Sequence, residues 1–520
     1  DEVLPFQILD IKAGRQSQGH RFLGKAVDLA NPSEYEEKLQ AEFVIVDAEK
    51  RKALIREQIQ AIAQEENWEV TPNADLLEEV NNLVEWPTAF SGKFDPKYLA
   101  IPEEVLITSM RDHQRFFFVR NQDGKLLPNF ISVRNGNKEH LENVIRGNEK
   151  VLTARLEDAA FFYDEDQKNS IDYYVDRLKK VSFHDKIGTM AEKMTRVGSI
   201  AQVIAKMLGL DAETAEDLQR AAAIYKFDLV TGMVGEFPEL QGVMGEKYAL
   251  LKGEKSAVAQ AIREHYMPNS AEGELPESTV GAVLALADKF DNIFSFFSAG
   301  MIPSGSNDPY ALRRHAYGIV RILAQRDWSL DLNKFEEAVK QALADDQTSF
   351  GVDVDKNFAE FFNDRIKQYL DHQSVSYDIE DAVLAGSQHN VTTIIAAAEV
   401  LTNAKAADSF KDEIEALTRV QRIATKNTTA GDLAVDPQLF NNETEGKLFD
   451  LITKIEAMND SDMAAFFKEL TSLTPAITEY FDATMVMDKD AKIKENRLNM
   501  MSRLANLVLR VGDLTKVMVK

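Results

Sequence analysis

The sequence contains no cysteine, and it has no apolar run of about 18 residues or more. Without cysteine the chain forms neither disulfides nor thiolate metal sites, which fits a reducing compartment. Because a long apolar run and a signal-peptide pattern are both missing, we expect no membrane-spanning helix and no secretion. The cytoplasm is therefore the predicted location.

Motifs that handle nucleotides are missing as well. No glycine-rich phosphate loop precedes a lysine, neither a GxGxxG nor an HxGH pattern occurs, and the eight histidines are scattered. These absences predict that the chain alone is non-catalytic, with no cofactor or metal of its own. Lys193 and Arg196 fall on an amphipathic helical stretch, and we expect both at its surface.

The charge balance limits the partners of this protein. With 60 Lys and Arg against 85 Asp and Glu, the net charge is −25, so a polyanion can bind only at a local basic face. Residues 492–520 supply one, because seven basic and two acidic residues give them a net charge of +5. On charge alone, a polyanion contact and a merely solvated helix face explain this stretch equally well. The apolar stripe of this helix is predicted to be Leu504, Leu507, Val508 and Val511, with Arg503 and Arg510 beside it.

Length and hydrophobic periodicity predict several domains and an α+β fold. At 520 residues the chain exceeds one hydrophobic core. Residues 1–165 mix strands with helices, whereas three- and four-residue apolar spacing predicts helices from residue 166 onward. We divide that helical part into residues 166–326, 327–407 and 408–520.

The clearest strand signals lie in the first region. Phe116–Arg120 and residues 130–134 form a predicted hairpin, with Asp123-Gly124 at its turn. Two strands alone would not bury its phenylalanines, so we expect a larger sheet. The short apolar runs 83–86 and 98–101 stop at proline and are also predicted to be strands.

Four sequence blocks in the central region identify a family. They are DLVTGMVGEF at 228–237, ELQGVMG at 239–245, ADKFD at 287–291 and DPYALRR at 308–314. In this order they closely resemble the beta subunit of bacterial heterotetrameric glycyl-tRNA synthetase. The resemblance extends over essentially the whole chain, and in that family a sizeable segment precedes the position of Asp1. We therefore expect this chain to lack the N-terminal segment of the family.

The resemblance implies a function for the chain. In this family the beta subunit recognises tRNA(Gly), while a separate alpha subunit forms glycyl-adenylate and transfers glycine to tRNA. The implied protein is thus a subunit of glycine–tRNA ligase in an α2β2 tetramer, whose ATP and Mg²⁺ are used by the holoenzyme. The implied partners are the alpha subunit and tRNA(Gly).

The C-terminal region resembles the helical anticodon-binding domain shared with arginyl-tRNA synthetases. Residues 496–514 look like its last helix, and the RVQRI stretch at 419–423 looks like an earlier one. The resemblance makes five arginines candidate tRNA contacts: Arg419, Arg422, Arg497, Arg503 and Arg510. Arg497 has an open alternative, because it could pair with an acidic neighbour inside the bundle.

Residues 166–326 are similar to the HD superfamily, whose members bind a metal through a His-Asp pair and further ligands. The pair position holds Phe227-Asp228, and phenylalanine cannot ligate a metal. Asp288 matches the later aspartate of the pattern, and His265 is a possible remaining ligand, so we predict a degenerate HD-like site without metal. Both residues also have an ordinary explanation, as a carboxylate beside a buried face and a helix-end histidine. The rival functions are an HD-type metal-dependent phosphohydrolase with an RNA-binding C-terminal domain, and a purely structural scaffold.

Overall fold

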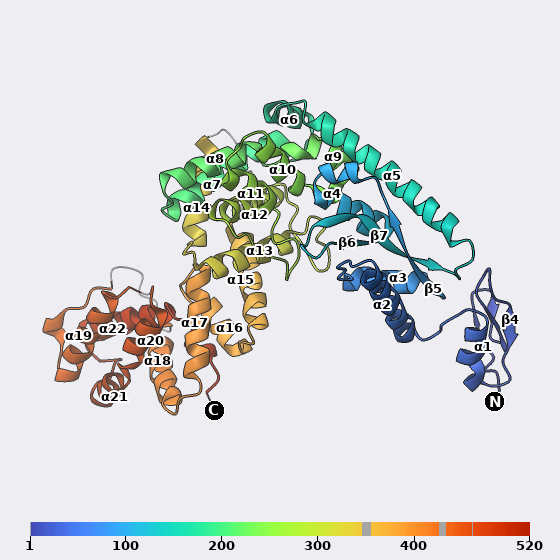
Figure 1. Ribbon diagram of the computed structural model, residues 1–520. Coiled ribbons are helices and arrows are strands. Elements are labelled where there is room, and N and C mark those ends of the chain that lie inside the picture. Colours follow the sequence, from blue (N-terminus) through green and yellow to red (C-terminus); the bar gives the residue numbers. More distant parts are fainter. Residues whose placement is uncertain (1, 346–354, 426–432, 460, 520) are drawn as a thin grey trace. The chain divides into compact units, whose positions relative to one another are not determined.

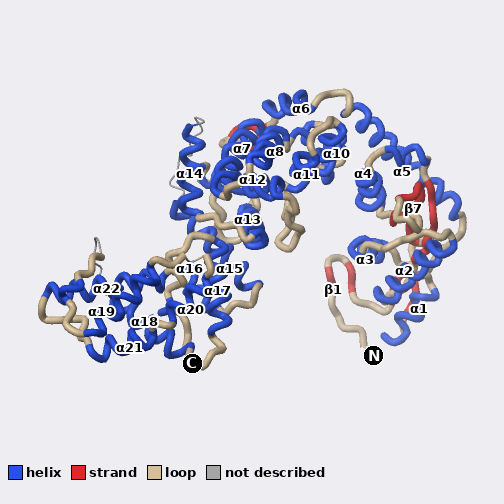
Figure 2. Tube along the Cα trace, turned by 60° about the vertical axis from the view of Figure 1, so that its left-hand side comes forward, coloured by secondary structure: helices blue, strands red, loops and turns tan. Residues whose placement is uncertain are grey.

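The computed structural model describes residues 2–345, 355–425, 433–459 and 461–519, which form two compact units. The N-terminal unit comprises residues 1–174 and 228–248, and the C-terminal unit comprises residues 175–227 and 249–520. Figure 2 shows strands in the N-terminal unit and helices almost throughout the C-terminal unit. The predicted α+β class is confirmed. The division into four regions stays a prediction.

The N-terminal unit contains strands in small sheets among helices of very different length (Figure 1). Its strands are β1 (Gln7–Ile8), β2 (Ile11–Lys12), β3 (Gln16–Gln18), β4 (Ala26–Asp28), β5 (Pro87–Lys93), β6 (Phe117–Arg120) and β7 (Leu126–Asn135). Its helices are α1 (Tyr35–Ala41), α2 (Ala48–Glu65), α3 (Ala74–Leu83), α4 (Glu103–Thr108), α5 (Leu141–Asp166) and α9 (Gly232–Glu236), and α6 (Ile171–Arg177) and α10 (Val243–Leu251) extend past its limits.

A three-stranded antiparallel sheet in the order β5-β7-β6 organises this unit. Helices α2 and α5 both pack on β5. Residues of α2, α3, β6 and β7 form a common hydrophobic core, which includes Ile55, Ile59, Leu76, Val119 and Ile131. Buried residues alternate with partly buried ones along β6, which explains why the hairpin could not exist without such a cover.

The hairpin and the larger sheet are confirmed, and the two other strand predictions are wrong. Gly124 adopts φ 77° in the turn that joins β6 to β7. In the same sheet, Phe130 of β7 lies opposite Gly92 of β5, where an added Cβ would collide with its ring. Leu83 instead ends α3 and residues 84–86 join it to β5, whereas residues 98–100 belong to a 3₁₀ helix that Asp95 caps. A stop at proline fits a helix end as well as a strand end.

The C-terminal unit is almost entirely helical. Its first part contains the short hairpin of β8 (Ser182–His184) and β9 (Gly188–Thr189), and the helices α7 (Met190–Met207), α8 (Ala212–Ile224), α11 (Ser256–Glu264), α12 (Thr279–Ser298), α13 (Leu312–Arg326) and α14 (Leu332–Asp345). Next come α15 (Asp355–His372), α16 (Tyr377–Leu384) and α17 (Val391–Ala404). The last part contains α18 (Phe410–Thr425), α19 (Glu443–Glu456), α20 (Met463–Thr471), α21 (Thr474–Ala483) and α22 (Ala491–Leu509).

Helix α12 is the centre of the first part of this unit. Every residue from Val280 to Phe297 is buried, and α7, α8, α11 and α13 pack around it. Three charged residues, Asp288, Lys289 and Asp291, nevertheless lie on this helix. Among the described helices, none is long and apolar enough to cross a membrane.

A buried carboxylate lies in α16, which packs against α15. Glu380 is 0% exposed, with Asp371 and Asp381 near it and the Lys367 ammonium 3.9 Å from its Oε2. Burial, reinforced by the hydrogen bond and charge of Asp371, raises the pKa of Glu380 to about 7. At neutral pH this carboxyl group is therefore partly protonated in the folded protein.

We expect the Glu380→Gln substitution to change how stability depends on pH. The folded pKa lies above the unfolded one, so the stabilisation from protonated Glu380 is present below pH ~4.5 and is lost as pH rises through about 7. The melting temperature of the parent should fall relative to that of Glu380→Gln between pH 5 and 8. Glu399→Gln, at an exposed position of α17, is the control. Parallel melting curves for parent and Glu380→Gln would contradict this assignment.

Candidate nucleic-acid interface

Helices α18 to α22 form a bundle in which α22 packs along α18. The predicted apolar stripe of α22 is confirmed, because Leu504, Leu507, Val508 and Val511 are at most 4% exposed. This stripe fixes which way the basic residues of α22 point. Lys520, at the end of the basic stretch, lies outside the described residues.

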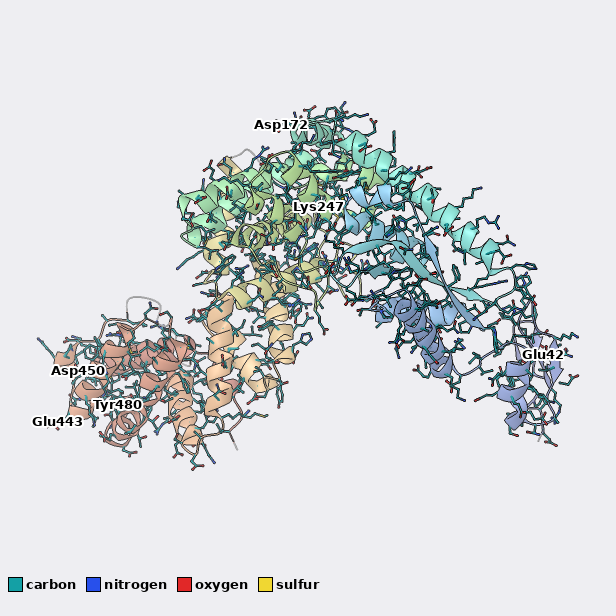
Figure 3. All side chains as sticks on the ribbon, in the orientation of Figure 1. Glu42, Asp172, Lys247, Glu443, Asp450 and Tyr480 are labelled. Carbon is teal, nitrogen blue, oxygen red and sulfur yellow. The ribbon has the colours of Figure 1, made fainter. Side chains whose placement is uncertain are left out.

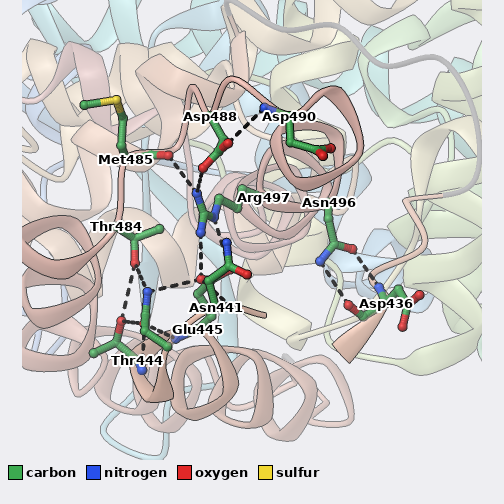
Figure 4. Close-up of polar contacts among 11 residues, drawn as sticks. Asp436, Asn441, Thr444, Glu445, Thr484, Met485, Asp488, Asp490, Asn496 and Arg497 are labelled. Atoms are coloured by element: carbon green, nitrogen blue, oxygen red, sulfur yellow. Dashed lines mark hydrogen bonds and ion pairs between the residues drawn. The ribbon is translucent and has the colours of Figure 1, made fainter. Parts of the chain in front are cut away.

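Arg497 lies inside the bundle (Figure 4). Its Nε and Nη2 donate to the two carboxylate oxygens of Glu445 on α19, at 3.1 and 2.8 Å. Its Nη1 donates to the Asp488 carboxylate at 2.8 Å and to the Met485 carbonyl at 3.0 Å. The side chains of Arg497 and Glu445 are 4% and 0% exposed. One guanidinium thus connects α22 to α19 and to the loop between α21 and α22.

This placement corrects the expectation that Arg497 faces a ligand. The alternative of an acidic neighbour inside the bundle is what the structure shows. The sequence pattern could not decide between them, because Glu445 is 52 residues away along the chain. Arg497 is therefore a structural residue that positions the loop after α21.

Arg503 and Arg510 are partly exposed on another side of α22. Arg503 forms a two-pronged ion pair with Glu456, and its guanidinium lies 5.1 Å from the Phe449 ring centre. Arg510 lies 4.4 Å over the Phe466 ring and donates to the Met458 carbonyl at 3.2 Å. Both arginines stay predicted tRNA contacts, although existing partners already take up part of their donor capacity.

Helix α19, which supplies the Glu456 partner of Arg503, carries exposed charges of both signs. It exposes Glu443 and Asp450 (Figure 3), and also Lys447 and Lys454. A carboxylate paired with an arginine lowers the positive potential that a phosphate would meet. Arg503 is therefore less favourable to a polyanion than the sequence alone suggested.

Arg419 and Arg422 lie together at an open groove, which we call the Arg419 groove. Its first hollow, of about 920 Å³, is lined by α18, α21 and residues 514–519, and includes both arginines. Its second hollow, of about 550 Å³, adjoins the first at Arg419 and is lined by residues 481–487. Within the described part of the chain, neither arginine forms an ion pair with a carboxylate, although Asp412 and Glu415 also line the first hollow.

The groove contains apolar side chains that sequence reasoning missed. The Arg419 guanidinium lies 4.0 Å over the Phe481 ring, and the loop after α21 exposes Met485 and Met487 by 75% and 50%. In the sequence, the apolar run Met485-Val486-Met487 between two helices was the available signal for this surface. The structure buries Val486 and leaves the methionine on either side of it exposed. Arginine cations beside an aromatic ring and methionine side chains can bind an unpaired nucleobase together with its phosphate.

The three residues of the predicted degenerate HD-like site have other partners. Asp228, in the N-terminal unit, is 0% exposed, and its Oδ2 accepts from the backbone N–H groups of Gly242 at 2.6 Å and Gly245 at 3.1 Å. His265 is 0% exposed, with Nδ1 2.6 Å from the Ile262 carbonyl oxygen. Burial and the Lys226 charge lower the pKa of His265 well below its usual range. Within the described residues, no three acidic or histidine side chains form a group that could hold a metal ion.

Asp288 belongs to a buried network of charges. It accepts from the Tyr225 hydroxyl at 2.9 Å, and the Lys193 ammonium lies 3.2 Å away. Although burial opposes ionisation, Lys193 and neighbouring cations hold the pKa of Asp288 well below its usual range. Lys193 also pairs with Asp291 at 3.0 Å, and Arg196 donates to Asp291 at 2.7 Å. The expectation that Lys193 and Arg196 are surface residues is wrong, because both pair with carboxylates of the central helix α12.

We expect Arg497→Met to destabilise the bundle strongly. Glu445 would remain buried without its cation, which costs about 3–5 kcal/mol of unfolding free energy. Arg419→Met, at an exposed position, should change it by no more than about 0.5 kcal/mol. Urea unfolding of both variants checks this, and the double variant Arg497→Met/Glu445→Leu should recover part of the loss. Equal losses for Arg497→Met and Arg419→Met would contradict the structural role of the pair.

Comparison with known families accounts for nearly the whole chain. Residues 1–385 match the family "Glycyl-tRNA synthetase beta subunit", and residues 414–516 match the family "DALR anticodon binding domain". The second match contains the Arg419 groove up to residue 516, together with all five arginines singled out from the sequence.

Curated relatives agree over the full chain. It is 73% identical to the glycine–tRNA ligase beta subunit of Pediococcus pentosaceus, and 55% and 56% identical to the proteins of that name from Lactiplantibacillus plantarum and Limosilactobacillus reuteri. In each case the match covers 100% of this chain and 76% of the relative. The family predicted from the four central blocks is confirmed, and this chain belongs to the glycyl-tRNA synthetase beta-subunit family.

Proposed function

We propose that this chain is the tRNA-recognition subunit of a glycine–tRNA ligase. A separate alpha subunit joins glycine to ATP as glycyl-adenylate, with release of pyrophosphate, and then transfers the glycyl group to a hydroxyl at the tRNA 3′ end, with release of AMP. The family match over residues 1–385 and the names of the relatives support this function. The chain contributes binding and orientation of tRNA rather than a reacting group.

One observation carries the proposal. The stretch that matches an anticodon-binding family, residues 414–516, places two arginines with no carboxylate partner among the described residues beside exposed apolar side chains. Anticodon bases are unpaired, so they can leave the stack and lie against such a surface. Arg419 and Arg422 can bind phosphate or stack on a base, since the guanidinium is planar and always charged. Arg503 and Arg510, which line neither hollow of the groove, remain proposed tRNA contacts.

The assembly and its cofactors are part of the proposal. ATP and Mg²⁺ would bind to the holoenzyme through the alpha subunit, because this sequence contains no phosphate-binding loop. We further propose an α2β2 tetramer in the cytoplasm, with tRNA(Gly) as the RNA partner. An acidic body of net charge −25 supports selective binding, because it repels RNA away from the local basic face.

No observation favours the rival HD-type phosphohydrolase. That reaction needs several ligands around a metal ion, whereas Asp228 accepts from two backbone N–H groups and Asp288 pairs with Lys193. A scaffold without RNA affinity is the other rival, and tRNA binding distinguishes it from the proposed function.

We expect Arg419→Ala and Arg422→Ala to weaken binding of a tRNA(Gly) transcript. A stacking or base-contacting arginine should cost about 1–3 kcal/mol, and a phosphate contact should flatten the dependence of log K on log salt by about one unit. Affinity measured across a salt series gives both quantities, and Arg503→Ala and Arg510→Ala complete the set.

Lys468→Ala is the matched control for these variants. It removes one exposed positive charge from α20 of the same bundle, and Lys468 lines neither hollow of the Arg419 groove. It should change the affinity by less than about twofold, as expected for an unspecific charge effect. If Arg419→Ala and Arg422→Ala behave like Lys468→Ala, the groove is not the tRNA contact.

We also expect the purified chain, free of alpha subunit, to show no glycine-dependent ATP–pyrophosphate exchange. Exchange should begin when the alpha subunit is added. Sustained exchange by the chain alone, at a rate above that of a preparation from cells without the gene, would overturn the division of labour proposed above.

A further inference from the structure

The C-terminal residues form one wall of the Arg419 groove. Leu514, Thr515, Val517 and Val519 line the first hollow, whereas the two arginines belong to α18. Of this segment, Leu514 is fully buried and Val517 nearly so. The width of the hollow therefore depends on what holds residues 514–519 in place.

The beginning of this wall is held by α18 and α16. Gln421 of α18, itself buried, donates to the Gly512 carbonyl at 3.1 Å and accepts from the Leu514 N–H at 3.0 Å. The Asp513 N–H donates to the Ala382 carbonyl of α16 at 2.8 Å. A Cβ on Gly512 would lie 2.7 Å from that same oxygen, so the turn fits closely against α16.

The far end of the wall is held by α16, whose Tyr377 hydroxyl donates to the Met518 sulfur at 3.2 Å and whose Asp378 binds the Met518 backbone. The Met518 N–H donates to Oδ2 of Asp378, in the first turn of α16, at 2.8 Å. Asp378 is 2% exposed, and the Lys405 ammonium at the end of α17 donates to both of its oxygens, at 2.9 and 3.1 Å. Burial raises the pKa of Asp378, but the hydrogen bonds from Lys405 and Met518 outweigh it and bring the pKa to about 2. The acceptor is therefore ionised at neutral pH.

We propose that Asp378 is a positioning residue for tRNA, because it holds residues 514–519 in place as the second wall of the Arg419 groove. The inference rests on the proposed function. Asp378 lies within residues 1–385, the part that matches the beta-subunit family, whereas the groove belongs to the anticodon-binding part. A residue outside the anticodon-binding part thus sets the shape of its RNA site. Asp378 lines neither hollow, so it acts through the Met518 N–H and not by touching RNA.

The affinity and its salt dependence separate this role from a direct contact. Loss of the anchor lets the wall move, which weakens tRNA binding, but it leaves Arg419 and Arg422, the proposed phosphate contacts of the groove, in place on α18. We therefore expect weaker binding with an unchanged salt slope. A variant that merely lowers stability should change the melting temperature and leave affinity unchanged well below that temperature.

Met518→Pro is the sharpest variant, because it deletes the donating N–H and leaves the Asp378–Lys405 pair intact. Val517 has φ −73° and ψ 128°, a conformation that precedes proline readily. Met518→Ala is its control, since it keeps the N–H and removes only the side chain. In the full 520-residue chain, Met518→Pro should bind a tRNA(Gly) transcript about fivefold more weakly than Met518→Ala, the usual effect of one lost hydrogen bond. Their salt slopes should be equal.

Substitutions of Asp378 complete the test. Asp378→Ala should lose as much affinity as Met518→Pro, whereas Asp378→Asn keeps an acceptor oxygen and should recover most of it. Asp217→Ala is the matched control, because it breaks the ion pair of another buried aspartate, to Lys255, in the same unit, and Asp217 lines neither hollow of the groove.

Each outcome bears on a different claim. Equal affinities for Met518→Pro, Met518→Ala and the parent would overturn this inference and leave the proposed function standing. An equal loss in Asp378→Asn and Asp378→Ala, with Met518→Pro unaffected, would also overturn it, because the charge of the Lys405 pair would then be responsible. If the parent chain does not bind tRNA(Gly), the proposed function fails and this inference with it.

Discussion

The ion pair between Arg497 and Glu445 is the interaction on which the C-terminal bundle depends. Glu445 cannot lose Arg497 without leaving its charge in a place that water does not reach. The same guanidinium also binds the Met485 carbonyl and Asp488, so the loop after α21 is fixed from inside the bundle. One edge of the Arg419 groove therefore takes its position from a residue that lines neither of its hollows.

The same constraint shapes the buried centre around α12. Lys193 and Arg196 of α7 form ion pairs with Asp288 and Asp291 of the buried helix α12. The Tyr225 hydroxyl also donates to Asp288, so the two carboxylates have partners although they are buried. Burial also lowers the pKa of Lys289 to about 7 and that of His315 to about 3, so this region disfavours further positive charge. The Lys193 ammonium compensates the negative charge of the Asp288 carboxylate, as a metal ion compensates the charge of its carboxylate ligands. Buried cations thus stabilise the carboxylates at the centre of this helical part.

Pairing also decides which cations are available to RNA on an acidic protein. Arg497 and Arg503 both pair with glutamates of α19, which reduces the positive potential of α22 that its sequence suggests. Arg419 lies over the ring of Phe481, a contact that leaves the charge of the guanidinium uncompensated. Residues 514–519 form the other wall of the Arg419 groove, and Asp378 of α16 holds them in place. The shape of this groove is thus coupled to the helices that precede the bundle.

The sequence by itself determined the family, the α+β class, the β6–β7 hairpin and the apolar stripe of α22. Each of these depends on residues that are close along the chain, where spacing, turn chemistry and motif order suffice. Only the tertiary structure decided which partners the charged residues meet. Arg497 meets Glu445 across 52 positions, Lys193 meets Asp291 across 98, and Met518 meets Asp378 across 140. A local pattern shows that a cation lies off the apolar stripe, but whether it meets a carboxylate, an aromatic ring or solvent depends on which distant helix packs there, because desolvation is set by the whole fold.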